Sequence, residues 1–434
     1  MERSRADVAG VSRSKKRTGG TVSELISAID VGTTKICALM GELDEANNLR
    51  VIGAGRVPAQ GLRRGVVVNT TDATAAIGQA VAEAEQSADQ VLSSALVGIA
   101  GSHINAIGSK GVVAVGRSGR AINKEDTQRA LEQARNIALP HNRDIIHVVP
   151  RSYSVDDQKG IENPVGMFGY RLEVDASIIT GASSSITNLV NCVQANGVEI
   201  DDLVLEPLAS AEAVLTCDER QLGVALVDIG GGTTDLAIYL DQAAWYTVVM
   251  DVGGDHFIRD VATGLRMPYG KAEALMKQFG QALPDRVPAD AEVRSGAFGQ
   301  DGQQTVNRRE LANILNARAD EITELIMREV KRSGYDSLLP AGIVLTGGMA
   351  QLPGLAELSR ERLEMPVRIG RPDGVVSSVM DLSSPEYATA VGLLLWGLRH
   401  GTGSKTRPGG PLPPPLHLRI IRWLRNLLPM PSSS

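Results

Sequence analysis

The sequence predicts an α/β fold in which two related lobes face each other across a phosphate site. Three observations lead to this prediction. The chain has 434 residues, which is too long for one hydrophobic core. Strand-like and helix-like segments alternate along most of it. Two similar hairpin sequences, AIDVGTTK at 28–35 and LVDIGGGTTD at 226–235, stand far apart in the chain, as if each lobe supplied one.

The composition narrows the possible functions. Hydrophobic residues make up 43% of the chain and charged residues 22%, which is typical of a globular protein. Aromatic residues make up only 3%, so we expect aliphatic cores. The net charge of -6 argues against nucleic acid as the main partner. Cys37, Cys192 and Cys217 form no metal-binding or disulfide pattern, and we expect them to be small buried residues.

The order of elements follows from hydrophobic periodicity. After a basic leader at 1–22, expected to be disordered, the folded body should run from about residue 24 to 398. We expect strand, turn and strand at 24–43. Beyond these we expect helices at 72–89, 123–139, 183–197 and about 308–333, strands at 111–116, 143–150 and 223–254, and a strand, glycine turn and helix at 341–363. No apolar run approaches the ~18 residues of a membrane span, and no signal-peptide core follows the basic N-terminus, so a cytoplasmic protein is expected.

The two hairpin turns carry the residues expected to bind phosphate. Glycine lets the backbone approach an anion closely, threonine adds hydroxyl donors, and lysine adds a cation. The candidates are Gly32, Thr33, Thr34, Lys35, Gly230, Gly231, Gly232, Thr233 and Thr234. Asp30 and Asp228 would repel bare phosphate, so they indicate a Mg²⁺ ion held between them, through water. Two ordinary hairpin turns are the alternative, which the repetition of the pattern disfavours.

A third glycine turn lies in IVLTGGMAQLPG at 343–354. A strand there delivers Gly347, Gly348 and Met349 to the start of a helix, where a flat ring could lie against bare backbone and anions are favoured. A plain strand-to-helix turn is the alternative. The chain has neither a P-loop GxxxxGK[ST] nor a GxGxxG pattern, so its nucleotide site would be of another type.

These motifs, in this order, resemble the phosphate 1, phosphate 2 and adenosine motifs of the actin, sugar kinase and chaperone ATPase superfamily. EPLASAEAVL at 206–215 and YATAVGLLLWGL at 387–398 resemble its two connecting helices. The resemblance is closer to the FtsA family of actin-like bacterial cell-division proteins, through RGVVVN, GIAGSHI, HVVPRSYSVDDQKGIENPVGMFGYRLE and AGIVLTGGMAQLPGL. It covers about residues 24–398 and the tail. It implies an actin-like, ribonuclease-H-like two-lobe ATPase fold with the FtsA-type inserted subdomain, and ATP with Mg²⁺ in the cleft.

The resemblance also implies a division of the chain. The first lobe would comprise 23–100, 181–215 and 383–400, and the inserted subdomain 101–180. The second lobe would comprise 216–265 and 336–382. Residues 266–335 would form its outer subdomain, which in the family receives the C-terminal peptide of FtsZ.

Three further site residues come from the resemblance alone. Glu273 and Lys277, in KAEALMK, would face the ribose hydroxyls and the adenine. A solvated helix face is the alternative for both. Glu206 would orient the attacking water, or it is a structural acid at a helix start, where the helix dipole favours it. Hydrolysis is expected to be weak at most.

The C-terminal segment HLRIIRWLRNLLP at 417–429 follows the Gly/Pro linker at 401–415. At ~100° per residue it forms an amphipathic helix, predicted over 416–430. Its apolar, membrane-facing residues are Ile420, Ile421, Leu424, Leu427 and Leu428. Trp423 lies at the boundary of this face. The basic residues Arg419, Arg422 and Arg425 lie on the opposite face. At ~1.5 Å per residue it spans roughly 20 Å, so it should lie on an anionic membrane surface rather than cross it. It also resembles the membrane-targeting helix of the FtsA family. A helix that folds back on the body, or binds another protein, is the alternative.

Together with the tail, the resemblance implies an adaptor that forms filaments on the inner face of the cell membrane at the division septum. It would tether FtsZ and help recruit other division proteins. A small-molecule kinase is one alternative, but no aspartate motif between the hairpins fits the required base. A pilus-assembly relative is another, which the tail disfavours. The chain length disfavours an MreB-like filament protein.

Overall fold

The computed structural model describes residues 25–44, 48–116, 120–296, 298 and 303–400. The predicted leader, the linker and the membrane helix with its residues from Arg419 to Leu428 lie outside this part of the chain, so those expectations stay predictions. Within the described residues, every helix is too short or too polar to cross a membrane.

The first sheet has the strand order β11-β6-β1-β2-β3-β19. Its strands are β1 Leu25–Val31, β2 Lys35–Leu43, β3 Leu49–Pro58, β6 Ser94–Ile99, β11 Glu199–Leu205 and β19 Val375–Ser377. Helix α1, Thr70–Ala88, packs on β3, and α3, Ser183–Gln194, packs against α1. The approach is close because β3 has no side chain at Gly55, where a β-carbon would lie 2.0 Å from the Ala80 carbonyl oxygen. A short hairpin, β4 Leu62–Arg63 and β5 Val66–Val67, precedes α1.

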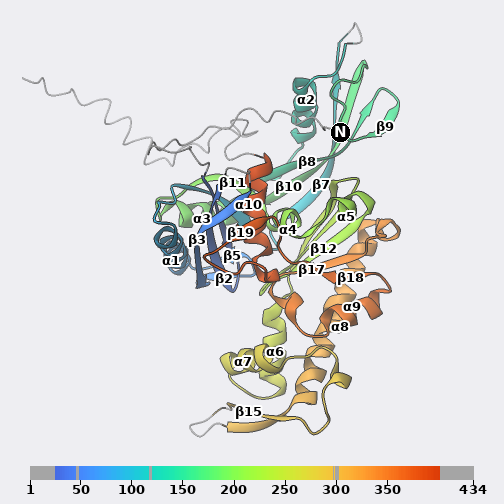
Figure 1. The fold of residues 1–434 in the computed structure, drawn as a ribbon. Helices are drawn as coiled ribbons and strands as arrows, with labels where there is room; N and C mark the ends of the chain where they lie inside the picture. Colours follow the sequence, from blue (N-terminus) through green and yellow to red (C-terminus); the bar gives the residue numbers. More distant parts are fainter. Residues whose placement is uncertain (1–24, 45–47, 117–119, 297, 299–302, 401–434) are drawn as a thin grey trace, which may run out of the picture.

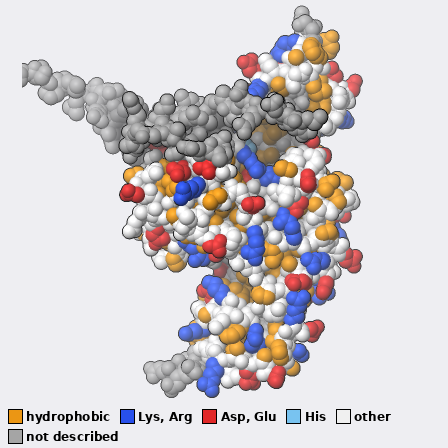
Figure 2. All heavy atoms as spheres, viewed as in Figure 1, with side chains coloured by type: hydrophobic (Ala, Val, Ile, Leu, Met, Phe, Trp, Pro, Cys, Tyr) orange, Lys and Arg blue, Asp and Glu red, His pale blue; other side chains and the backbone are white. Residues whose placement is uncertain are grey.

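A second sheet, with order β7-β10-β8-β9, stands apart at the top of Figure 1. Its strands are β7 Asn105–Ala114, β8 Arg143–Val155, β9 Gln158–Ile161 and β10 Arg171–Ala182. Helix α2, Lys124–Arg135, packs on it and begins with a capping box between Asn123 and Asp126. The sheet and helix share their own hydrophobic core, as expected for an independent subdomain. In the space-filling view the same region projects from the rest of the molecule (Figure 2).

The third sheet has the order β14-β13-β12-β17-β18. Its strands are β12 Val224–Ile229, β13 Thr234–Leu240, β14 Ala243–Met250, β17 Ile343–Thr346 and β18 Val367–Ile369. One core joins this sheet to the helices beyond it, which are α6 Gly254–Gly264, α7 Tyr269–Phe279, α8 Arg308–Ser333 and α9 Leu355–Leu363. The hairpin of β15 Glu292–Gly296 and β16 Gln303–Asn307 lies at the far end (Figure 1). The 3-10 turns are η1 Pro284–Arg286, η2 Asp336–Leu338, η3 Gly348–Gln351 and η4 Pro385–Tyr387.

Helices α4, Glu206–Val214, and α10, Ala388–His400, pack against each other between the first and third sheets. A β-carbon at Gly392 would lie 1.9 Å from the Ala209 carbonyl oxygen, so the two helix backbones nearly touch. A short helix, α5 Cys217–Leu222, follows α4. The two lobes therefore meet on a tightly packed helix pair.

The structure corrects some sequence expectations. The predicted helix at 123–139 spans only Lys124–Arg135, because the backbone of Asn136 already leaves the helical region, with a ψ of 64°. Strand β8 continues past Pro150 to Val155, because the register against β10 shifts at the proline, which cannot donate a ladder hydrogen bond. Cys37 and Cys192 are buried as expected, but Cys217 is exposed.

Candidate functional site

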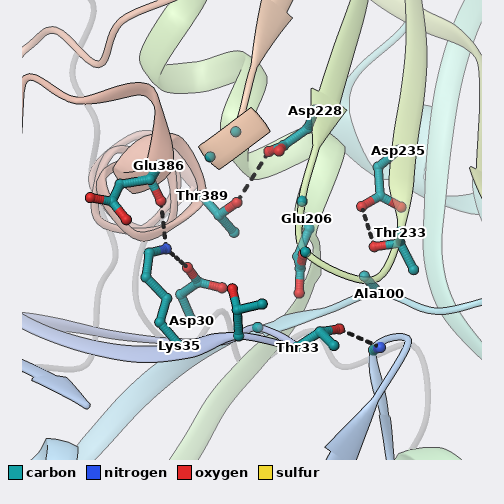
Figure 3. A pocket seen from close by; sticks show the side chains of 17 residues that line it. Asp30, Thr33, Lys35, Ala100, Glu206, Asp228, Thr233, Asp235, Glu386 and Thr389 are labelled. Carbon is teal, nitrogen blue, oxygen red and sulfur yellow. Dashed lines mark hydrogen bonds and ion pairs between the residues drawn. The ribbon is translucent and has the colours of Figure 1, made fainter. Parts of the chain in front are cut away.

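The turns of the two predicted hairpins face each other across the gap between the lobes (Figure 3). The first turn joins β1 to β2, and the second joins β12 to β13. A β-carbon at Gly231 would lie 2.2 Å from the Cγ2 of Thr34, and one at Gly232 would lie 2.7 Å from the Oγ1 of Thr33. Each of these two glycines thus stands where the opposite turn leaves no room for a side chain.

A cavity of about 80 Å³ lies between the two turns, and most of the predicted site residues line it. These residues are Asp30, Gly32, Thr33, Thr34, Lys35, Glu206, Asp228, Gly230, Gly231, Thr233, Gly347 and Gly348. The third glycine turn therefore reaches the same cavity as the two hairpins. Its Gly347 has a φ of 85°, which a residue with a side chain would adopt only with strain.

Three predicted residues near the cavity are not part of its lining. Gly232 packs on Thr33, as described above. The Thr234 hydroxyl donates to the Val252 carbonyl oxygen at 2.7 Å and so supports the turn from behind. The Met349 side chain lies against Gly254. These three residues shape the turns rather than the cavity surface.

Glu273 and Lys277 lie on α7, away from the cavity lining. The Lys277 Nζ lies 2.6 Å from the Glu273 Oε1, and the Lys277 and Glu273 side chains are 69% and 36% exposed respectively. Glu273 and Lys277 therefore lie on a solvent-exposed helix face, the alternative considered above. Their contacts with ribose and adenine stay predictions.

Five acidic residues line the cavity. The carboxyl groups of Asp30, Glu206, Asp228 and Asp235 gather around one lysine of the lining, Lys35 (Figure 3), while the Glu386 carboxylate pairs with Arg56. The three aspartates are buried, and Glu206 is partly exposed at the start of α4. Burial, and next the neighbouring carboxylates, raise the pKa of Glu206 and of Asp235 well above the usual range. Burial raises the pKa of Asp228 to about 6. The cluster therefore carries more acid than its one lysine can neutralise.

Lys35 and Asp228 are held by specific partners. The Lys35 ammonium donates to the Glu386 carbonyl oxygen at 2.5 Å and lies 3.5 Å from Asp30. The Ser210 hydroxyl of α4 donates to the Asp228 Oδ2 at 2.7 Å. Because α4 begins with Glu206, one turn before Ser210, both side chains lie on the same face of that helix.

Asp235 has weaker hydrogen-bond support than Asp228. It lies directly opposite Asp228 in the β12–β13 ladder, and like charges so placed destabilise a sheet. Its Oδ2 accepts a hydrogen bond from the Thr233 hydroxyl at 3.3 Å, while its buried Oδ1 has no hydrogen-bond partner among the described residues. A cation in the cavity would offset this charge, so the donor set fits Mg²⁺. Within the described residues, no three His, Cys, Asp or Glu side chains are arranged to ligate one ion directly, which is compatible with binding through water.

Sequence reasoning missed five residues of the lining: Gly65, Ala100, Asp235, Glu386 and Thr389. Asp235 could have been found, because residues equally distant from a hairpin turn pair on one face. Ala100 contributes no chemical group that a motif search would single out. Gly65 and Glu386 come from segments that only the assembled lobes bring to the site.

Solved structures with similar folds identify the fold class. The chain resembles a structure described as the "PilM-PilN type IV pilus biogenesis complex", with a TM-score of 0.63 at 15% identity, covering 86% of this chain and 98% of that one. It also resembles MreB5 of Spiroplasma citri bound to ADP, with a TM-score of 0.51 at 14% identity, covering 88% and 98%. Together with the facing hairpins, these similarities define the fold as that of the actin-like ATPases.

Relatives with similar sequences identify the protein family. The chain is 39% identical to the cell division protein FtsA of Pseudomonas aeruginosa over 93% of its own length and 98% of that relative. It is 36% identical to FtsA of Bacillus subtilis, covering 87% and 84%. The family model "Cell division protein FtsA" matches residues 225–392, and "SHS2 domain inserted in FTSA" matches residues 101–180. The chain belongs to the FtsA family of cell division proteins, which confirms the predicted fold with its FtsA-type insertion.

Proposed function

We propose that the chain binds Mg·ATP between its two hairpin turns, forms filaments on the inner face of the cell membrane and tethers FtsZ there. The observation that carries the ATP-binding part is the meeting of both turns, the third glycine turn and four carboxyl groups around one cavity. The ADP bound to the similar MreB5 structure supports nucleotide as the ligand. The pilus neighbour is similar in fold alone.

Within this site, the backbone N–H groups of the two glycine turns and the threonine hydroxyls would bind the phosphates. Asp30 and Asp228 would hold Mg²⁺ through water, and the ion would neutralise phosphate charge. Lys35 would exchange part of its contact with the Glu386 carbonyl for phosphate. Glu206, partly exposed at the cavity, would orient water for slow hydrolysis, while Glu273 and Lys277 would bind the nucleoside.

The remaining parts of the proposal concern partners. Residues 266–335, the outer subdomain, would receive the C-terminal peptide of FtsZ. Residues 101–180 would be available to other division proteins or to the next subunit of a filament. The amphipathic segment 416–430 would bind anionic lipid weakly, and a filament would bind strongly by presenting many such segments in a row. This arrangement would place the protein at the division septum, on the cytoplasmic side of the membrane.

Co-sedimentation with anionic vesicles and FtsZ tests the proposal. We expect the full chain to carry FtsZ into the vesicle pellet, more strongly with Mg·ATP than without it. Deleting residues 416–434 should abolish vesicle binding and leave ATP binding intact. Vesicle binding that survives the deletion, or FtsZ that pellets equally without this protein, would contradict the proposal.

A further inference from the structure

The hairpin of β4 and β5 lies against the β1–β2 turn and the β12–β13 turn, which are called the first and second phosphate turns below. Neither nucleotide motif includes this hairpin. Its turn residues, Arg64 and Gly65, have φ values of 51° and 73°. A left-handed backbone is ordinary for glycine but unfavourable for arginine, which has a β-carbon. Strain of this kind persists where the surrounding structure imposes it, and it often marks a functional position.

The Arg64–Gly65 turn contacts each phosphate turn through the backbone. The Gly65 N–H donates to the Thr33 Oγ1 at 3.0 Å, which fixes the first turn. A β-carbon on Gly232 would lie 3.0 Å from the Arg64 Cα, so the second turn packs on the same point. The hairpin is therefore in contact with both halves of the cavity at once.

The Arg64 side chain reaches across to the second lobe and forms an ion pair with Asp251. Asp251 follows β14 and precedes the residues that hold the second turn from behind. There the Gly254 N–H donates to the Gly230 carbonyl oxygen at 2.9 Å, and the next N–H, of residue 255, donates to the Gly231 carbonyl oxygen at 2.7 Å. The ion pair thus joins the β4–β5 hairpin, which contacts the first phosphate turn, to the segment after β14, which is hydrogen-bonded to the second.

The hairpin itself is firmly anchored to the first lobe. The Gly61 carbonyl oxygen accepts hydrogen bonds from the N–H groups of Val68 and Asn69, at 2.8 and 3.0 Å, and the Asn69 side chain caps α1. The Arg64 and Asp251 side chains, by contrast, are 36% and 38% exposed. Of the contacts between the β4–β5 hairpin and the second lobe described here, the ion pair is therefore the one that can break most easily.

We propose that the Arg64–Gly65 turn is a clasp, in which the ion pair from Arg64 to Asp251 holds the two phosphate turns together and slows nucleotide release. The clasp rests on the proposed function, since it needs a nucleotide bound between the turns. Arg64 acts through the turns that it joins and is a positioning residue. Breaking the ion pair should speed release while leaving the phosphate-binding groups intact.

Charge reversal tests the clasp on the full chain. The variants are Arg64→Glu, Asp251→Arg and the double variant that carries both. Each protein is loaded with a fluorescent ATP analogue and Mg²⁺, and the release rate is measured after adding excess ATP. We expect each single change to raise the release rate about two- to fivefold, since an exposed ion pair is weak. The double variant, which restores an ion pair of reversed polarity, should return to within about twofold of the wild-type rate.

Arg362→Glu is the matched control. It breaks an exposed ion pair with Asp320, in which the Arg362 Nε and the Asp320 Oδ1 are 2.7 Å apart and neither residue lines the cavity. It should leave the release rate unchanged. Raising the salt concentration from about 0.05 M to about 0.5 M should speed release from the wild type, because salt screens exposed charges. This salt test needs no variant and stands even if a charge reversal prevents folding.

The outcomes separate the clasp from the proposed function. Normal binding with unchanged release in the single variants, or a double variant that remains fast, overturns the clasp alone. Salt-independent release from the wild type also overturns it. A wild-type chain that binds no Mg·ATP analogue overturns the proposed function and the clasp together.

Discussion

Gly231 lies against Thr34 so closely that the β1–β2 turn and the β12–β13 turn can meet only because residue 231 lacks a side chain. A β-carbon there would lie 2.2 Å from the Thr34 Cγ2 and 3.0 Å from its Oγ1. Contacts below about 3 Å between carbon atoms are strongly repulsive. The closed arrangement of the cavity therefore depends on this pair, which no feature of either hairpin alone predicts.

The Gly231→Ala substitution should weaken Mg·ATP binding at least about tenfold, because the added methyl group pushes the turns apart. Adding Thr34→Ser should recover part of the affinity, since serine removes the Cγ2 that the methyl group meets. Calorimetric titration of both variants checks this. Gly270→Ala is the control, because a β-carbon at Gly270 meets no atom of the described residues within 4 Å. Wild-type affinity in Gly231→Ala would contradict the closed arrangement.

Replacing Asp228 with asparagine should stabilise the nucleotide-free protein at pH 7.5. Burial raises the pKa of Asp228 to about 6, from 3.8 in an unperturbed side chain. Between these values the unfolded chain loses the proton first, so stability falls as the pH rises, by up to about 3 kcal/mol above pH 6. An asparagine side chain would avoid this cost and could still accept the Ser210 hydrogen bond.

We therefore expect the Tm of Asp228→Asn to exceed that of the wild type by several degrees at pH 7.5, and the difference to shrink toward pH 4. The same variant should bind Mg·ATP more weakly, if Asp228 helps to hold the ion. Thermal unfolding at several pH values measures the first effect. A variant less stable than the wild type at pH 7.5 would show that the buried charge carries no such cost.

Acid should destabilise the protein through His147. Its Nε2 accepts the Leu205 N–H at 3.1 Å, which ties β8 to the residue before Glu206, so the ring must be neutral there. Burial, and to a lesser extent His400, lower the pKa of His147 to about 4. In the unfolded chain this pKa is about 6.5, so the stability is complete above pH 6.5 and is lost as the pH falls toward 4, by up to about 3 kcal/mol.

The His147→Gln variant tests this assignment. It should lose less Tm than the wild type between pH 7 and pH 4.5, whatever its stability at neutral pH. The matched control is His141→Gln, whose side chain is exposed. If His147→Gln and the wild type lose equal Tm over this range, another group causes the acid sensitivity.

The Gly392→Ala substitution should destabilise the fold by about 3 kcal/mol or more, because it forces α4 and α10 apart. A β-carbon there would lie 1.9 Å from the Ala209 carbonyl oxygen. Since α4 also carries Glu206 and Ser210, we expect the variant to lose ATP affinity together with stability. Unfolding by heat, followed by circular dichroism, measures the effect. A Tm within a degree or two of the wild type would show that the helix pair is less tightly packed than the structure indicates.

The sequence predicted the hairpins because their chemistry is local. Glycine, threonine and aspartate stand within ten residues of one another at both sites, and strand periodicity flanks them. The long helix predicted at about 308–333 is confirmed as Arg308–Ser333, and the structure shows local signals at both ends, an Asn307 cap and a Gly334 in left-handed backbone.

What the sequence could not predict depends on contacts between distant segments. The pairing of Arg64 with Asp251 and the reach of Glu386 to Lys35 join residues that are far apart in the chain. Ala100 lines the cavity through its position alone. The exposed Cys217 was mispredicted because the expectation rested on the residue type alone, and the six residues of α5 are too few for hydrophobic periodicity to show which side is buried.

Calorimetric titration of the nucleotide-free full chain with ATP, with and without Mg²⁺, shows whether the cavity between the two turns binds Mg·ATP. We expect saturable binding at one site that depends on Mg²⁺ and is lost when Asp30 and Asp228 are both replaced by asparagine. Absence of binding by the wild type, or equal binding by the double variant, would contradict it.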